Sequence, residues 1–321
     1  MSLAYSAIVI GFFLLAWGAD RFVLGASAIA RNLGISPLII GLTVVAFGTS
    51  FPEMLISAVA AWEGNPSLAI GNAIGSNITN IGLVLGATAL IVPLTIHSDT
   101  LQREFPILFV VMVFTLLLML DNELGRLDGF LLIIGMFVLL YWIVRLAIRT
   151  RKTDPMKAEF TVEIPYHMPT RKAVTHFFVG LIVLFISSKI LVWGAIVVAK
   201  SFGISDLVIG LTIVAIGTSL PELAASIMSA IKKEHDIAVG NIIGSNMFNL
   251  LAVMGIAGVI HPASFVSEVL TRDFLLMFIL TAGLFAMAYG MRGSNHINRW
   301  KGSILLLTWF GYLVYLYQTS I

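Results

Sequence analysis

The sequence contains no cysteine among its 321 residues. This absence excludes disulfide bonds, thiolate metal sites and thiol nucleophiles. Charge is also scarce, because charged residues make up 11% of the chain, whereas soluble domains carry about 25%. The net charge of +2 is too small to indicate a nucleic-acid partner, and nothing in the composition indicates an obligate protein partner.

The chain consists mostly of apolar residues, which account for 59% of it, and its mean hydropathy is +0.99. An apolar run of roughly 20 residues crosses a bilayer as a helix, and such runs follow one another almost from end to end. Ten spans are expected, at residues 4–30, 36–61, 66–92, 101–120, 127–149, 173–200, 205–230, 236–260, 270–290 and 300–318. The sequence therefore predicts an all-α polytopic protein embedded in a lipid bilayer.

The two halves of the chain repeat one another at a constant shift of 169 residues. The matching pairs are Gly34-Ile-Ser and Gly203-Ile-Ser, Gly41-Leu-Thr and Gly210-Leu-Thr, Gly48-Thr-Ser and Gly217-Thr-Ser, Pro52-Glu53 and Pro221-Glu222, and Gly75-Ser-Asn and Gly244-Ser-Asn. Each half has five predicted spans, an odd number, so the copies are expected to lie in the membrane with opposite orientations. Inverted repeats place substrate sites at the repeat interface near the midplane.

The predicted boundaries and orientation follow from the long polar interval between the halves. We expect a five-helix repeat at 1–149 with its motif at 41–91, a linker at 150–171, and a second repeat at 172–321 with its motif at 210–260. Basic residues are concentrated in the linker and in the turns on the same side. Because cytoplasmic loops carry an excess of lysine and arginine, the linker is predicted to be cytoplasmic and both termini to lie outside.

A proline breaks the second and seventh spans beside an acidic residue. Pro52 lacks the N–H that would bond the carbonyl of Gly48, and Pro221 likewise releases Gly217. One residue further on are Glu53 and Glu222. A carboxylate at bilayer depth costs about 2.5–3.5 kcal/mol on the gentlest scales, so it is a functional candidate by default.

The third and eighth spans offer the facing wall of the predicted site. A stripe at helical spacing is formed by Asn72, Ser76 and Asn80, and repeated by Asn241, Ser245 and Asn249. Gly75 and Gly244 are expected to interrupt these two helices, although glycines at such spacing also serve ordinary helix packing. Carboxylate, hydroxyl and amide oxygens suit Ca²⁺ or Na⁺ rather than Zn²⁺. Broken helices 2, 3, 7 and 8 are therefore predicted to form an ion-binding core.

One charged position differs between the copies, since Asp20 in the first span corresponds to Lys189 in the sixth. This difference favours a local ion pair or an interfacial position for Asp20 over a part in transport.

At the two motifs the chain resembles the sodium/calcium exchanger family of the calcium/cation antiporter superfamily, and its layout is similar to that of compact members in the bacterial inner membrane. The family's G-T-S-x-P-E and G-N-x-x-G-S-N-x-x-N-type sequences stand at 48–53 with 71–80, and at 217–222 with 240–249. The resemblance implies ion ligation by the side chains of Thr49, Ser50, Glu53, Ser76, Asn80, Thr218, Ser219, Glu222, Ser245 and Asn249, and by the carbonyls of Ala46 and Ala215. It also implies that the first and sixth spans slide against the rest. Some potassium-dependent relatives have aspartate at the position of Asn249, so potassium dependence is disfavoured.

The predicted function is antiport of Na⁺ against Ca²⁺ by alternating access, in the direction of Ca²⁺ extrusion, with no enzymatic activity and no cofactor. Ca²⁺/H⁺ exchange, in which the glutamates carry protons, is the nearest alternative. A cation channel is a second alternative, which suits the paired broken helices less well. A membrane enzyme is disfavoured because the spans contain no Ser/His pair, HExxH motif or paired aspartates.

Overall fold

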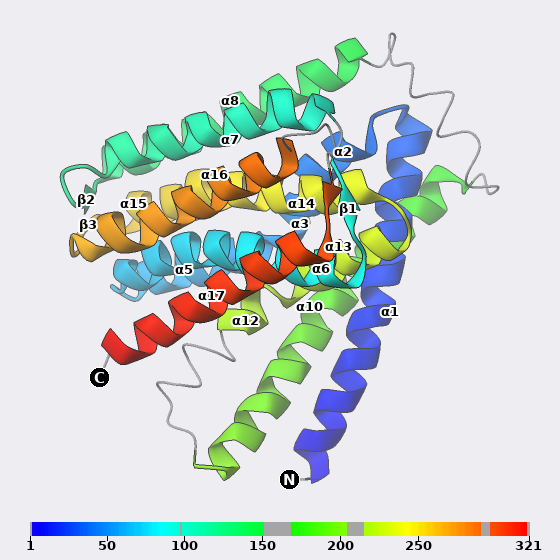
Figure 1. Ribbon diagram of the computed structural model, residues 1–321, viewed down its shortest axis with the longest axis horizontal. Helices are drawn as coiled ribbons and strands as arrows, with labels where there is room; N and C mark the ends of the chain where they lie inside the picture. The colour runs from blue at the N-terminus through cyan, green and yellow to red at the C-terminus, as the bar shows by residue number, and fades with distance from the viewer. Residues whose placement is uncertain (1, 97, 151–167, 204–214, 290–295, 320–321) are drawn as a thin grey trace.

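The computed structural model describes residues 2–96, 98–150, 168–203, 215–289 and 296–319. Within these ranges the chain is almost wholly helical, with four strands of two residues each. Figure 1 shows two long helices, α1 and α10, that run at a steep angle to the other long helices. The predicted all-α class is therefore confirmed.

The first half of the chain contains a long helix, two interrupted helices and a helical pair. In order these are α1 (Ser2–Leu33), α2 (Pro37–Ile40), the π-helical turn η1 (Gly41–Val45), α3 (Ala46–Thr49), α4 (Phe51–Trp62), α5 (Pro66–Thr79), the π-helical turn η2 (Asn80–Leu85), α6 (Gly86–Ile91), β1 (Leu94–Thr95), α7 (Ser98–Leu118), β2 (Glu123–Leu124) and α8 (Arg126–Thr150).

The second half follows a similar order of elements. They are α10 (Thr170–Ser201), α12 (Ala215–Thr218), α13 (Leu220–Ile231), α14 (His235–Phe248), the π-helical turn η4 (Asn249–Val253), α15 (Met254–Ile260), β3 (Ala263–Ser264), the π-helical turn η5 (Val269–Phe274), α16 (Leu275–Tyr289), β4 (His296–Ile297) and α17 (Arg299–Thr319). Where the ten predicted spans lie in the described ranges they coincide with helical segments, apart from a few residues at their ends and at the two bends. The beginning of the seventh span lies outside the described residues.

Not every one of these helices has the length and composition of an independent span. Six of the described helical segments are long and apolar enough to cross a bilayer, and the bent segment from Pro37 to Trp62 makes a seventh. This number is smaller than the ten spans expected from the sequence.

Helices α1 and α10 pack against one another through glycines that bring their backbones together. A Cβ added at Gly25 would lie 2.4 Å from the Phe177 amide nitrogen, and one at Gly180 would lie 2.3 Å from that of Phe22. Further along, Gly11 packs in the same way on Leu191. Contacts at rising numbers on α1 meet falling numbers on α10, so the two helices are antiparallel.

The predicted break at Pro52 is present as a bend of 42° between the segments that end at Thr49 and begin at Phe51. Ser50 lies at the bend and precedes α4, in which proline occupies the first turn. Proline is tolerated there because the first amides of a helix have no partner within it. Ser219 and Pro221 occupy the same places before and in α13.

The interruption of the third and eighth spans differs from the prediction. Helix α5 continues through Gly75 and α14 through Gly244, and each ends where a π-helical turn begins, at Asn80 and Asn249. The expectation of breaks at the two glycines is therefore wrong. Gly244 instead packs closely, because a Cβ there would lie 2.4 Å from the Leu42 carbonyl oxygen. A π-helical turn holds one extra residue, and such turns are frequent at functional sites.

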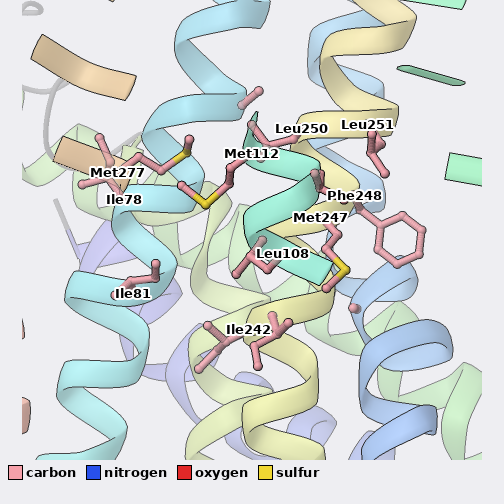
Figure 2. Close-up of a cluster of buried hydrophobic side chains, with 14 of the residues drawn as sticks. Ile78, Ile81, Leu108, Met112, Ile242, Met247, Phe248, Leu250, Leu251 and Met277 are labelled. Carbon is pink, nitrogen blue, oxygen red and sulfur yellow. The ribbon is translucent and has the colours of Figure 1, made fainter. Parts of the chain in front are cut away.

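A large apolar core surrounds the π-helical turns. Figure 2 shows side chains from both halves meeting there, among them Ile78, Met112, Ile242 and Met277. Two short strand pairs also join the halves: β1 pairs antiparallel with β4, and β2 with β3. Burial of this core places the polar residues of α4, α5, α13 and α14 in the interior of the bundle.

Candidate functional site

The two glutamates singled out from the sequence are buried at equivalent places. Glu53 lies in the first turn of α4 and Glu222 in the first turn of α13, and the exposed fraction of each is 1%. A helix N-terminus carries partial positive charge, which favours a carboxylate in the first turn. The local sequence, with proline directly before glutamate, thus starts a helix and places an acid at its favourable end.

The helices that carry the glutamates each pack against the π-helical turn of the other half. Helix α4 contacts η4 and α15, and α13 contacts η2 and α6. Ser50 Oγ lies 3.4 Å from Glu222 Oε1 and donates to it. The carboxyl groups of Glu53 and Glu222 are close enough to interact electrostatically. The fold therefore brings the two acids to one place, although they are 169 residues apart in the sequence.

The asparagines Asn72 and Asn241 connect the third and eighth spans to the glutamate helices. The Nδ2 group of Asn72 donates to Ser57 Oγ at 3.1 Å and to the Glu53 carbonyl at 3.3 Å. That of Asn241 donates to Ser226 Oγ at 3.1 Å. The hydroxyl of Thr49 donates to Asn241 Oδ1 at 3.0 Å, which crosses from one half to the other.

A second layer of asparagines lies at the beginning of the π-helical turns. Asn80 Nδ2 donates to Asn246 Oδ1 at 3.1 Å, and Asn249 Nδ2 donates to Asn77 Oδ1 at 3.0 Å. The two bonds join corresponding residues of the two halves in exchanged roles, since the shift of 169 converts one pair into the other.

Several buried oxygen atoms at the site have no hydrogen-bond partner among the described residues. They are Glu53 Oε2, Glu222 Oε2, Asn80 Oδ1, Asn249 Oδ1, Ser219 Oγ and Ser245 Oγ. Buried oxygens without partners cost free energy, about 1–3 kcal/mol each and more when charged. All six are hard oxygen donors, and four of them are carboxylate or amide oxygens, which Ca²⁺ binds in proteins. Within the described ranges no three His, Asp or Glu residues cluster as a metal site would require, so neutral oxygens would have to complete any coordination shell.

The remaining predicted ligands lie in the same region, with differences. Thr49, Ser50 and Ser76 are buried, and Thr218 is half-buried. The Ala46 carbonyl already accepts hydrogen bonds from the Ser50 amide at 2.9 Å and the Thr49 hydroxyl at 3.4 Å. A carbonyl oxygen has two lone pairs, so this carbonyl is less open to a cation than the resemblance implies. Ala215, whose carbonyl was the other backbone ligand implied, begins α12.

The sequence interpretation overlooked four residues that organise this site. Ser57, Asn77, Ser226 and Asn246 contact the predicted ligands directly. The signal was present in the sequence, because Ser57 and Ser226, like Asn77 and Asn246, are separated by the shift of 169 residues.

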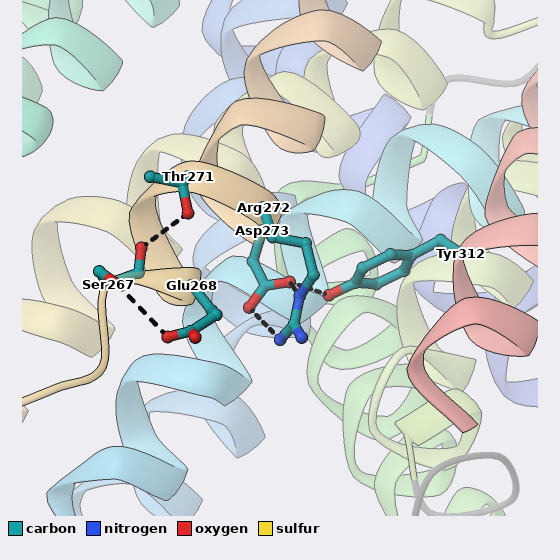
Figure 3. Close-up of polar contacts among 6 residues, drawn as sticks. All are labelled: Ser267, Glu268, Thr271, Arg272, Asp273 and Tyr312. Carbon is teal, nitrogen blue, oxygen red and sulfur yellow. Dashed lines mark hydrogen bonds and ion pairs between the residues drawn. The ribbon is translucent and has the colours of Figure 1, made fainter. Parts of the chain in front are cut away.

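A further polar cluster lies away from this centre, where α17 meets η5. Figure 3 shows Arg272 and Tyr312 both turned toward Asp273. Arg272 Nε lies 2.6 Å from Asp273 Oδ1, and the Tyr312 hydroxyl donates to the same oxygen at 2.9 Å. The acid is thus neutralised by its own neighbour, and the cluster serves to join η5 to α17.

Comparison with known proteins places the chain in one family along nearly its whole length. The family model described as "Sodium/calcium exchanger protein" matches residues 3–145 and 172–318. Similar proteins include CaxA of Alkalimonas amylolytica, 47% identical over 99% of this chain and 100% of that protein, and the inner membrane protein YrbG of Escherichia coli (strain K12), 40% identical over 100% and 98%. Among solved structures, the sodium-calcium exchanger NCX_Mj superposes with a TM-score of 0.83 at 31% identity, covering 98% of this chain and 99% of that one. The chain therefore belongs to the sodium/calcium exchanger protein family and is a membrane-spanning cation antiporter.

Proposed function

We propose that this antiporter exchanges Na⁺ for Ca²⁺ and that both ions bind at the Glu53–Glu222 centre. The observation that carries the proposal is the set of six buried oxygens without partners, contributed by equivalent residues of both halves. Two carboxylates supply the charge that neutralises one Ca²⁺, and hydroxyl and amide oxygens supply further ligands. Thr49, Ser50, Ser76 and Thr218 line the same centre, together with the carbonyls of Ala46 and Ala215.

We further propose that the chain forms ten spans arranged as two inverted repeats, 1–149 and 172–321, joined by the linker at 150–171. The antiparallel contact of α1 with α10 supports opposite orientations, because these helices begin the two copies. The contacts are reciprocal under the shift of 169: Gly25 faces Ala173, and Gly194 faces Ala4. Inverted repeats related by a twofold axis in the membrane plane give alternating access around a central site.

Orientation and direction follow from charge. Basic residues in the linker favour a cytoplasmic location for it, with both termini outside, in the plasma membrane of a bacterial cell. Na⁺ and Ca²⁺ share the same two carboxylates in this scheme, so that binding of one cargo excludes the other. Entry of Na⁺ down its gradient would then drive Ca²⁺ out of the cell.

Calcium flux in proteoliposomes tests the exchange. Purified protein is reconstituted in Na⁺-loaded vesicles, and ⁴⁵Ca²⁺ uptake is measured after dilution into Na⁺-free medium. Uptake that requires the outward Na⁺ gradient supports the proposal. Uptake that follows an imposed pH gradient and ignores Na⁺ would replace it with Ca²⁺/H⁺ exchange, and Ca²⁺ flux without any counter-ion would indicate a channel.

A further inference from the structure

Two asparagines outside the predicted ligand set hold the amides of two asparagines inside it. Asn77 accepts from Asn249, and Asn246 accepts from Asn80, at 3.0 and 3.1 Å. The exposed fractions of Asn77 and Asn246 are 1% and 2%, so water does not compete for these bonds.

The direction of one of these contacts is fixed by the backbone. Asn77 Nδ2 donates to the carbonyl oxygen of Asn246 at 3.1 Å. Because a carbonyl oxygen only accepts, Asn77 must present its nitrogen there and its oxygen on the other side. That oxygen in turn accepts only from a donor, so Asn249 must present Nδ2 to it. The Oδ1 atom of Asn249 is thereby left facing elsewhere, buried and without a partner.

We propose that Asn77 and Asn246 are positioning residues that fix the amide orientation of Asn249 and Asn80, so that oxygen rather than NH₂ faces the cation. The proposal rests on the function proposed above. An asparagine amide has nearly the same shape after a 180° rotation about its last bond. In the rotated form, two N–H donors would point at the cation and repel it. The held form presents a lone pair, and the electrostatic sign of the ligand is thus set by a residue that does not touch the ion.

Calcium binding to purified protein, measured by calorimetry, tests this role. Asn77→Leu keeps the volume but removes the acceptor, and should raise the Ca²⁺ dissociation constant by about 10- to 100-fold, as is typical when a partner of a metal ligand is lost. Thr115→Val is the matched control, because this fully buried hydroxyl bonds only the Val111 carbonyl of its own helix. Its affinity should equal that of the unmodified protein.

A double-mutant cycle distinguishes orientation from simple structural support. A carboxylate has oxygen at both ends and needs no orientation, so in an Asn249→Asp background the change Asn77→Leu should cost little or nothing. Equal losses in both backgrounds would overturn the proposal, because independent effects add. Unchanged affinity in the single variant would overturn it as well. If the unmodified protein bound no Ca²⁺ or Na⁺, the proposed function would fail and this proposal with it.

A second, independent observation concerns how the α1–α10 pair is attached to the rest of the bundle. Lys232 Nζ, in the turn between α13 and α14, lies 2.6 Å from Asp20 Oδ1 on α1. Close by, Ser27 of α1 donates to Glu234 of the same turn. The expectation of an ion pair for Asp20 is confirmed, since Arg21 also lies 3.8 Å from it, but the closer partner is 212 residues away in the sequence.

The equivalent positions in the other copy carry the same two charges in exchanged places. The shift of 169 converts Asp20 to Lys189 on α10, and Lys232 to Glu63 in the turn after α4. Both Lys189 and Glu63 are exposed, and no ion pair joins them in the described structure. One copy therefore holds a closed acid–base pair where the other holds the same pair open.

We infer that Asp20–Lys232 and Lys189–Glu63 are alternating ion pairs that stabilise opposite states of the transporter. Helices α1 and α10 are held together by backbone contacts at Gly25 and Gly180, so they move as one body. Exchanging the roles of the two copies opens the first pair and closes the second. Each state then has one pair closed, which keeps the two states close in free energy despite their different contacts.

The absence of cysteine makes the natural chain a ready background for cross-linking. Two double variants are made, Asp20→Cys with Lys232→Cys, and Lys189→Cys with Glu63→Cys, and membranes are treated with an oxidant. Each pair should form a disulfide, and each disulfide should block Ca²⁺ transport until it is reduced. Glu123→Cys with Ser264→Cys is the control, because these residues face each other across β2 and β3. It should cross-link without loss of transport.

The quadruple variant tests exclusivity. Molecules should contain one disulfide or the other, and peptide mapping should find no molecule with both. Failure of the Lys189–Glu63 positions to cross-link, or abundant molecules with both disulfides, would overturn the inference. These readouts need no transport, so they remain decisive even if the cargo were not Ca²⁺.

Discussion

At the scale of single residues, the buried acids are the feature that any account of this protein must explain. Glu53 and Glu222 form no ion pair with a lysine, arginine or histidine in the described structure. Removing a carboxylate from water costs several kcal/mol unless an opposite charge replaces the solvent. The fold supplies hydroxyl and amide dipoles but no resident cation side chain, so a transported cation is the natural counter-charge.

Neutralising either acid should therefore abolish Ca²⁺ transport. Glu53→Gln and Glu222→Gln keep the shape and remove one charge. Loss of one member of a buried charge pair costs about 3–5 kcal/mol, which corresponds to a loss in affinity of more than about a hundredfold. Sodium-driven ⁴⁵Ca²⁺ flux is the measurement, with Glu123→Gln in an exposed strand as the control of equal chemistry. Normal flux in a Gln variant would remove that carboxylate from the site.

At the scale of elements, the positions of helix ends decide where polar groups are available. Proline starts α4 and α13, and the π-helical turns η2 and η4 begin at the ligand asparagines. The surrounding helices are then brought close by glycine. Gly82 packs against the Trp309 side chain and Gly86 against the Gly302 backbone, which holds η2 and α6 against α17. The Trp309 indole also donates to Thr79 Oγ1 at 3.2 Å.

Close packing of α1 with α10 makes a prediction about stability. In Gly180→Ala the new Cβ would lie 2.3 Å from the Phe22 amide nitrogen, so the two backbones must separate. Overpacking of this kind costs about 1–3 kcal/mol. The thermal unfolding temperature of the detergent-solubilised protein should fall. Gly283→Ala is the matched control, because no described atom lies within 4 Å of its added Cβ; its unfolding temperature should be unchanged or higher. Equal behaviour of the two variants would contradict the packing described.

At the scale of the whole molecule, charge balance governs how transport responds to voltage. Two ionised glutamates neutralise one Ca²⁺ or two Na⁺, so a third Na⁺ makes the exchange cycle move one net charge. One charge crossing the membrane is worth about 2.3 kcal/mol per 100 mV. The resemblance to the exchanger family favours this stoichiometry of three to one.

The steady-state Ca²⁺ gradient should therefore change by about fiftyfold for each 100 mV of membrane potential. Proteoliposomes with valinomycin and a range of K⁺ gradients set the potential, and entrapped Ca²⁺ is measured at steady state. A Ca²⁺ gradient that ignores the potential would instead indicate electroneutral exchange of two Na⁺ for one Ca²⁺. Vesicles without protein provide the baseline.

Much of this molecule follows from its sequence alone. Low charge and long apolar runs require a bilayer, and the shift of 169 residues, visible as paired motifs, reveals two copies. The pairing of proline with glutamate identifies Glu53 and Glu222, because proline acts on its own helix and a lone carboxylate in an apolar run has no local explanation. These inferences succeed since each depends on neighbours within a few residues.

Other features were decided only by the tertiary structure. The π-helical turns begin at Asn80 and Asn249 rather than at the glycines, because packing across the two halves, and not local propensity, sets where the helix takes up an extra residue. The contacts of Asn77 with Asn249, and of Asp20 with Lys232, join residues that are far apart in the chain. Sequence patterns report which chemical groups are present, but which atom of an amide faces an ion depends on hydrogen bonds that exist only after the two copies have packed together.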